Sequence, residues 1–179
     1  MRLSKYSTLK TAASERGSVD AGSNPTYLAL SPSGTELYVA NEVDTEAGGI
    51  TALAIADDGT LTVLNHQTGS DGGFAYVAVD PSGNFAFGAA YNGGSVSVFP
   101  IQADGSLGPE ATNRDFGSQS NSHCVGFDPS GRFAFVPNKG NNEVAQLILG
   151  SDGSLSDNSP ATVTTAQGAG PRHIRSSDS

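Results

Sequence analysis

The chain has 179 residues with 23 glycines and one cysteine, and its 18 acidic residues outnumber 9 basic ones, giving a formal net charge of −9. A single cysteine excludes an intrachain disulfide and a multi-cysteine zinc site, and the acidic balance argues against nucleic acid or a membrane surface as a partner. The sequence shows no apolar run typical of a signal peptide or a membrane span, so we expect a cytoplasmic protein.

A repeat of about 48 residues organises the chain. A Pro-Ser-Gly turn recurs at residues 32–34, 81–83 and 129–131. A second turn, Asp-Gly followed by Thr-Leu or Ser-Leu, recurs at residues 58–61, 104–107 and 152–155. Two independent markers share one spacing, which indicates a repeated structural unit.

Each unit predicts four strands, taken here in chain order. Apolar residues alternate on both sides of the Pro-Ser-Gly turn, most clearly at Val125, Phe127, Phe133 and Phe135. Alternation bounded by turn residues predicts a β-hairpin. A third strand is predicted at 49–55, 95–101 and 143–149, and a fourth at 61–65 and, more weakly, near Leu107 and Leu155. Each unit is therefore predicted to be a four-stranded antiparallel meander.

Four strands in about 48 residues match the size of one β-propeller blade. A β-sandwich would not require identical turns at a fixed spacing, so the sequence predicts an all-β propeller. We place blades at about 24–70, 71–119 and 120–168, with the start of a fourth at 169–179. These make about three and a half blades, fewer than a closed propeller needs, so we expect part of a larger ring. Residues 1–23 are expected to be an N-terminal segment able to supply an outer strand to a closing blade.

Two columns differ between the repeats when the turn prolines are aligned. The first column holds Thr26, Ala75, His123 and His173, and the second holds Glu42, Tyr91 and Lys139. In a propeller both columns belong to loops on one face, so we expect these groups to meet at one end of the central channel. Such a set suits acid–base or anion-binding chemistry. A hydrogen-bonded structural role is the alternative for His123, and the neighbouring Cys124 is interpreted as a small buried apolar residue.

The chain resembles the lactonase family of seven-bladed β-propellers, of which it would be the N-terminal half. The resemblance is carried by Asn-Pro-Thr-Tyr-Leu-Ala-Leu-Ser-Pro-Ser-Gly at 24–34, Ser-His-Cys-Val-Gly-Phe-Asp-Pro at 122–129 and Gly-Ala-Gly-Pro-Arg-His at 168–173. That family includes the propeller type of 6-phosphogluconolactonase and the fungal carboxy-muconate cyclases. It implies an ester hydrolase of the pentose phosphate pathway that opens a sugar-acid lactone such as 6-phosphogluconolactone.

The resemblance also implies a site on one channel face, with no metal and no cofactor. His123 would act as general base and acid, and Arg172 would bind the substrate anion and the developing oxyanion. Residues expected to bind the anionic lactone are His173, Lys139, Glu42 and Tyr91. A glutamate and a further arginine that the family carries would fall beyond Ser179.

Two other interpretations remain open from the sequence. One is reversible lactonisation of a carboxy-muconate by the same groups. The other is a catalytically inactive propeller fragment or binding scaffold. In every case open blade edges predict self-association.

Overall fold

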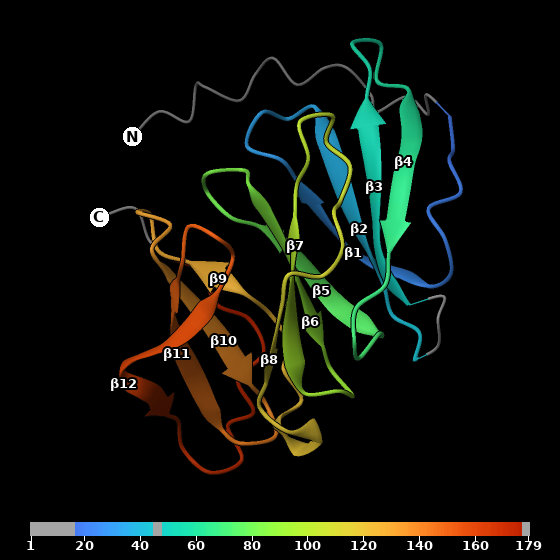
Figure 1. Ribbon diagram of the computed structural model, residues 1–179. Helices are drawn as coiled ribbons and strands as arrows, with labels where there is room; N and C mark the ends of the chain where they lie inside the picture. The colour runs from blue at the N-terminus through green and yellow to red at the C-terminus, as the bar shows by residue number, and fades with distance from the viewer. Residues whose placement is uncertain (1–16, 45–47, 177–179) are drawn as a thin grey trace, which may run out of the picture.

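Three four-stranded antiparallel sheets form the computed structural model, which describes residues 17–44 and 48–176 (Figure 1). The first sheet contains β1 (Pro25–Leu30), β2 (Glu36–Asn41), β3 (Gly49–Ile55) and β4 (Leu61–Gln67). The second contains β5 (Phe74–Val79), β6 (Phe85–Ala90), β7 (Ser95–Pro100) and β8 (Thr112–Asp115). The third contains β9 (Gly126–Phe127), β10 (Phe133–Asn138), β11 (Glu143–Leu149) and β12 (Leu155–Thr164).

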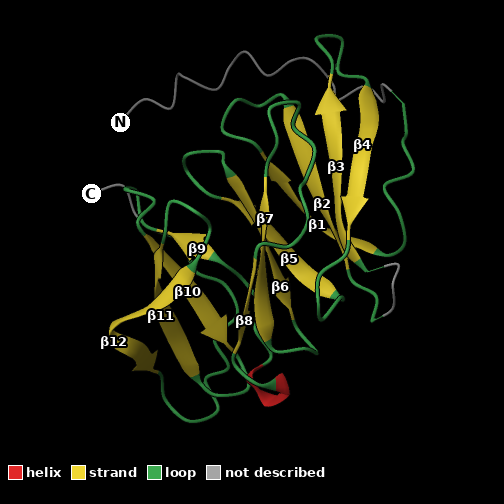
Figure 2. Cartoon of the chain, in the orientation of Figure 1, coloured by secondary structure: helices red, strands yellow, loops and turns green. Residues whose placement is uncertain are grey.

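Strands follow chain order within every sheet, so each sheet is a meander and a propeller blade. β1 of the first blade contacts β5 of the second, which brings the two first strands together. The helical structure of the described residues is a single 3₁₀ turn, Ser118–Ser120, between the second and third blades (Figure 2). These blades confirm the predicted all-β propeller architecture. No helix in the described ranges is long and apolar enough to cross a membrane.

Two of the three Pro-Ser-Gly turns are fixed by the aspartate before the proline, and the first has Ser31 there, whose hydroxyl accepts the N–H of Glu36. The Asp80 carboxylate accepts hydrogen bonds from the backbone N–H of Ser82 at 3.0 Å and of Phe85 at 2.7 Å. Gly83 closes the turn with a φ of 77°, a conformation that glycine adopts without a steric penalty. Asp128 binds its own turn in the same way, so a shared local chemistry produces the repeated hairpins.

Side chains pack between blades in two clusters. The first cluster joins the first and second blades, and its largest buried members are Tyr38, Ile50, Phe74 and Phe99. The second joins the second and third blades through Phe87, Val98, Val136 and Leu147. Full burial stabilises each such side chain by about 1.5–3 kcal/mol. The alternation predicted for the strands therefore gives the second blade one apolar face toward each of its two neighbours.

One hydroxyl is buried inside the first cluster. Tyr38 donates a hydrogen bond to the carbonyl of Gly105 at 3.0 Å, and this bond joins β2 to the hairpin turn of the second blade. Burial, with the nearby charges of Glu36 and Asp104, raises the pKa of Tyr38 to about 12. The phenol therefore stays neutral and keeps its hydrogen bond.

The fourth strand of the second blade departs from the predicted position. Leu107 makes only an isolated bridge with Ile101, and the regular strand β8 begins at Thr112. The backbone of Leu107 is instead held by the side chain of Asn65, which accepts at 2.9 Å and donates at 2.7 Å. Gly108 and Pro109 follow at once, and a proline cannot donate to a strand ladder. The blade edge is therefore interrupted between the bridge and β8.

The segment before β1 has no regular secondary structure at residues 17–23. The Asn41 side chain donates hydrogen bonds to the carbonyls of Ala21 and Ser23, both at 2.9 Å. Most of the predicted outer strand falls on residues 1–16, outside the described residues, so that assignment stays a prediction. Residues 171–176, at the predicted start of a fourth blade, lack regular structure and bring Ile174 against Gly126.

Candidate functional site

A β-bulge lies at the first divergent column in each blade. The strand register shifts by one residue at Thr26 in β1 and at Ala75 in β5. In the third blade the same shift falls between Ser122 and Gly126, the segment that contains His123. A bulge inserts an extra residue that has no paired residue on the neighbouring strand, and it changes the direction in which that side chain points. The column can therefore hold threonine, alanine or histidine without disturbing the packing between blades.

Two imidazoles and two phenol rings meet at this bulge. The rings of His123 and His173 lie edge to face, with centroids 5.0 Å apart. Tyr91 packs edge to face on His123 at 5.6 Å, and Tyr76 lies 6.1 Å from His173. The structure thus brings together Tyr91 and both predicted histidines, from the end of β6, the loop before β9 and the segment after β12.

Lys139 joins this group through Tyr91. Its ammonium donates a hydrogen bond to the Tyr91 hydroxyl at 2.9 Å and lies 5.5 Å from the centroid of the same ring. Asn121 supports both residues, because its side chain donates to the carbonyl of Tyr91 and its own carbonyl accepts the N–H of Lys139. Asn121 has a φ of 49°, in the left-handed region that asparagine tolerates better than most residues. The second divergent column therefore contributes a phenol and an ammonium to the site.

His123 is the most perturbed base of the group. Burial, followed by the charge of His173 and then by those of Arg172 and Lys139, lowers its pKa below the ordinary 6.5. Its Nδ1 is buried without a hydrogen-bond partner among the described residues, so we assign the role of the base to Nε2. The imidazole is therefore neutral at pH 7 and can accept a proton.

Neither Arg172 nor Glu42 forms a hydrogen bond or ring contact with the four rings of the site among the described residues. Arg172 is exposed, makes no ion pair within the described residues, and is near enough for its charge to act on His123. The Glu42 N–H donates to the carbonyl of Asn24 and the Glu42 carbonyl accepts from the Asn24 side chain, but the Glu42 carboxylate has no hydrogen bond or ion pair in the described ranges. The geometry therefore groups His123, His173, Tyr91 and Lys139, with Arg172 beside them, and gives Glu42 no contact with the group.

Two tyrosines that lie outside the divergent columns support the site. Tyr76 stacks on Tyr27 with ring centroids 4.1 Å apart and also faces His173. Burial and contacts with Tyr27 and Cys124 raise the pKa of Tyr76. Burial likewise raises the pKa of the Cys124 thiol, which fits its interpretation as a buried apolar residue. The divergent columns could not reveal Tyr27 and Tyr76, because the first two blades carry the same residue, tyrosine, at this position.

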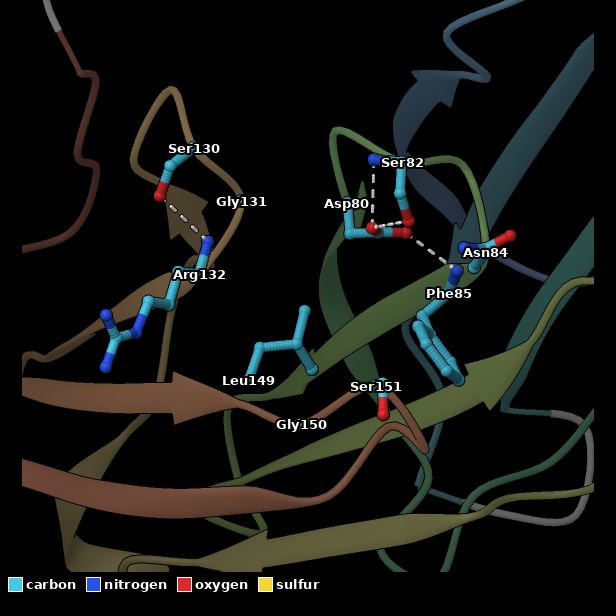
Figure 3. Close-up of a pocket in the computed structure, with 10 residues that line it drawn as sticks. All are labelled: Asp80, Ser82, Asn84, Phe85, Ser130, Gly131, Arg132, Leu149, Gly150 and Ser151. Atoms are coloured by element: carbon cyan, nitrogen blue, oxygen red, sulfur yellow. Dashed lines mark hydrogen bonds between the residues drawn. The ribbon is translucent and has the colours of Figure 1, made fainter.

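A pocket lies at the other end of the strands, by the Pro-Ser-Gly turns (Figure 3). This pocket of about 320 Å³ is lined by Asp80, Ser82, Asn84, Phe85, Ser130, Gly131, Arg132, Leu149, Gly150 and Ser151. Its carboxylate, Asp80, is already satisfied within its own turn, and the guanidinium of Arg132 points away from it (Figure 3). No group of three histidine, cysteine or acidic side chains suited to a metal occurs in the described ranges. The reactive groups therefore gather at the bulged end.

Fold and site together define a β-propeller with a group of imidazole, phenol and ammonium side chains at the bulged end of its blades. Comparison with known proteins gives the family: the model described as "Lactonase, 7-bladed beta-propeller" matches residues 2–179, and the chain belongs to that family.

Named relatives agree with this family. A 6-phosphogluconolactonase of Bacillus subtilis (strain 168) is 41% identical over 101 residues, which are 56% of this chain and 29% of that protein. A 6-phosphogluconolactonase of Yersinia pestis (strain Pestoides F) is 32% identical over 156 residues, 87% of this chain and 45% of that protein. The structure of the Pseudomonas aeruginosa periplasmic gluconolactonase PpgL superposes with a TM-score of 0.76 at 28% identity, covering 84% of this chain and 47% of that one. The chain spans less than half the length of these relatives.

Proposed function

We propose that the protein hydrolyses the lactone of a sugar acid, with 6-phosphogluconolactone as its substrate in carbohydrate metabolism. The observation that carries the proposal is a neutral imidazole, His123, which packs on His173 and lies within reach of the charges of Lys139 and Arg172. The names of the relatives support a sugar lactone over a carboxy-muconate. The cytoplasmic location stays a prediction.

The chemistry follows from the roles that each group can fill. His123 Nε2 takes a proton from a water molecule as the water oxygen attacks the lactone carbonyl. Arg172 offers two parallel N–H donors to the oxyanion that develops on the carbonyl oxygen. When the ring C–O bond breaks, the protonated His123 returns the proton to the leaving hydroxyl oxygen. The products are a carboxylic acid, which ionises in solution, and the freed hydroxyl group of the sugar acid.

Removal of the base tests the proposal. In His123→Ala, kcat/KM for 6-phosphogluconolactone should fall by about 100-fold or more, because general-base catalysis contributes roughly that much. The rate is measured as acid release in a pH-stat above the spontaneous rate. His66→Asn is the matched control, because His66 lies on β4 and bonds Thr51 rather than the ring group. An unchanged kcat/KM in His123→Ala would remove His123 from the mechanism.

A further inference from the structure

Lys139 is a cation held in place without a carboxylate. Within the described residues the only ion pair joins Arg114 and Asp157, at 2.7 Å, although the whole chain carries twice as many acidic as basic residues. Lys139 is half-buried, and its ammonium is fixed by a neutral phenol, Tyr91. A lysine ammonium has three donors, and the phenol takes one of them. The others are available to an anion that the protein itself does not supply.

The Lys139 ammonium and the His123 imidazole both contact Tyr91, so the two groups belong to one site. The Tyr91 hydroxyl accepts the hydrogen bond of the Lys139 ammonium at 2.9 Å, and the His123 imidazole packs on the Tyr91 ring with the centroids 5.6 Å apart. An anionic group carried a few bonds away from a lactone carbonyl can therefore reach Lys139 while the carbonyl lies at His123. Arg172 is left for the oxyanion, so the two cations have separate tasks.

We propose that the Tyr91–Lys139 pair binds the second anionic group of the substrate, its phosphate, and so determines the preference for a phosphorylated over a plain sugar lactone. The inference rests on the proposed function, since it assigns a specificity role within the same site. Tyr91 is a positioning residue: its hydroxyl fixes the ammonium and its ring keeps that ammonium at a set distance from His123. Asn121 holds both partners from the loop between the blades.

Binding of the two reaction products tests the proposal without requiring turnover. The chain has three histidines, so the imidazole C–H signals of His66, His123 and His173 can be followed separately by NMR during titration with 6-phosphogluconate or gluconate. We expect the signals of His123 and His173 to move with both ligands, and 6-phosphogluconate to bind about tenfold more tightly. His66, bonded to Thr51 on β4, serves as the internal reference for an intact fold.

The variants separate specificity from general affinity. Lys139→Gln should reduce the preference for 6-phosphogluconate to about twofold or less, mainly by weakening the binding of 6-phosphogluconate. Tyr91→Phe keeps the ring but releases the ammonium, so it should lower the preference by a smaller factor. Arg132→Gln is the matched control: it removes one positive charge at the opposite end of the strands and should keep the wild-type preference.

Two outcomes would count against the inference in different ways. A wild-type preference that persists in Lys139→Gln, with both ligands still moving the His123 signal, overturns the role of Lys139 and leaves the lactonase proposal standing. If neither product moves the signals of His123 and His173 in the wild-type chain, the proposed function itself is overturned. An unchanged His66 signal shows in either case that the fold is intact.

Discussion

The environment of His123 in the folded chain lowers the free energy of unfolding by an amount that depends on pH. The pKa of this imidazole is lowered by burial and by the charges of His173, Arg172 and Lys139, so the unfolded chain binds a proton more readily than the folded one. Stability should therefore fall as the pH drops from the ordinary value of 6.5 toward the lower folded pKa, and this loss is complete below it. Folding selects the neutral form that the proposed reaction uses.

Replacing His123 by Asn should remove that part of the pH dependence. We expect the urea midpoint of the wild-type chain to fall between about pH 7.5 and about pH 5.5, and that of His123→Asn to fall less. The turn carboxylates of Asp104 and Asp152 do not contribute in this range, because hydrogen bonds from Ser106 and Ser154 lower their pKa below 3.8.

His173→Asn provides the matched comparison for this residue. It removes the largest charge contribution to the lowered pKa of His123 but leaves the burial, so its midpoint should show a pH dependence between those of the wild type and His123→Asn. Equal slopes in all three proteins would contradict the assignment of the effect to His123.

In β6 a glycine makes room for an aromatic ring. A Cβ on Gly88 would lie 2.8 Å from Phe74, which is fully buried and packs edge to face on Phe99. The first and third blades have Val39 and Val136 at the position of Gly88, and both have a residue smaller than phenylalanine at the position of Phe74. We expect Gly88→Ala to destabilise the chain by about 1–3 kcal/mol through overpacking.

A double-mutant cycle tests this pairing of residues in the second blade. In the Phe74→Leu background the added methyl group should cost less than in the wild type, because the shorter side chain yields space. Urea unfolding of the four proteins gives the coupling. If Gly88→Ala costs the same in both backgrounds, the ring contact is not the reason for the glycine.

The elements that the sequence predicts are those that repeat, and the others depend on contacts across blades. The two turn markers and the alternation at Phe133 and Phe135 were sufficient to predict four strands per unit. The delayed start of β8 at Thr112 was not predicted, because it depends on Pro109 together with a contact from another blade, that of Asn65 with the backbone of Leu107. The bulge at His123 also left no pattern, since an extra residue in one strand is defined only against its partner strand.

The candidate site was partly predictable for the same reason. Columns that differ between repeats located Tyr91, Lys139 and both histidines, because residues freed from common packing can vary. They could not show that Tyr91 contacts both Lys139 and His123, or that Glu42 makes no contact with the group, since both depend on side-chain orientation.

Across the whole molecule, the three blades leave apolar faces at both ends of the stack. On the first blade Leu28 and Leu30 are 57% and 60% exposed beside an apolar groove of about 430 Å³. On the third blade Val163 is 50% exposed. Each end face has the same strand arrangement as the faces that pack between blades, and exposed patches of this kind promote association. The net charge of −9 opposes it through repulsion.

The 179-residue polypeptide should therefore self-associate, and more strongly as salt screens the repulsion. Light scattering after size exclusion should show a mass above 18.1 kDa that rises between about 0.05 M and about 0.5 M NaCl, since screening shortens the range of charge repulsion. Leu30→Lys places a charge on the end face and should shift the protein toward monomer. Ala103→Lys adds the same charge at an exposed hairpin turn and should leave the mass unchanged. A monomeric mass at every concentration and salt would show that the end faces do not associate.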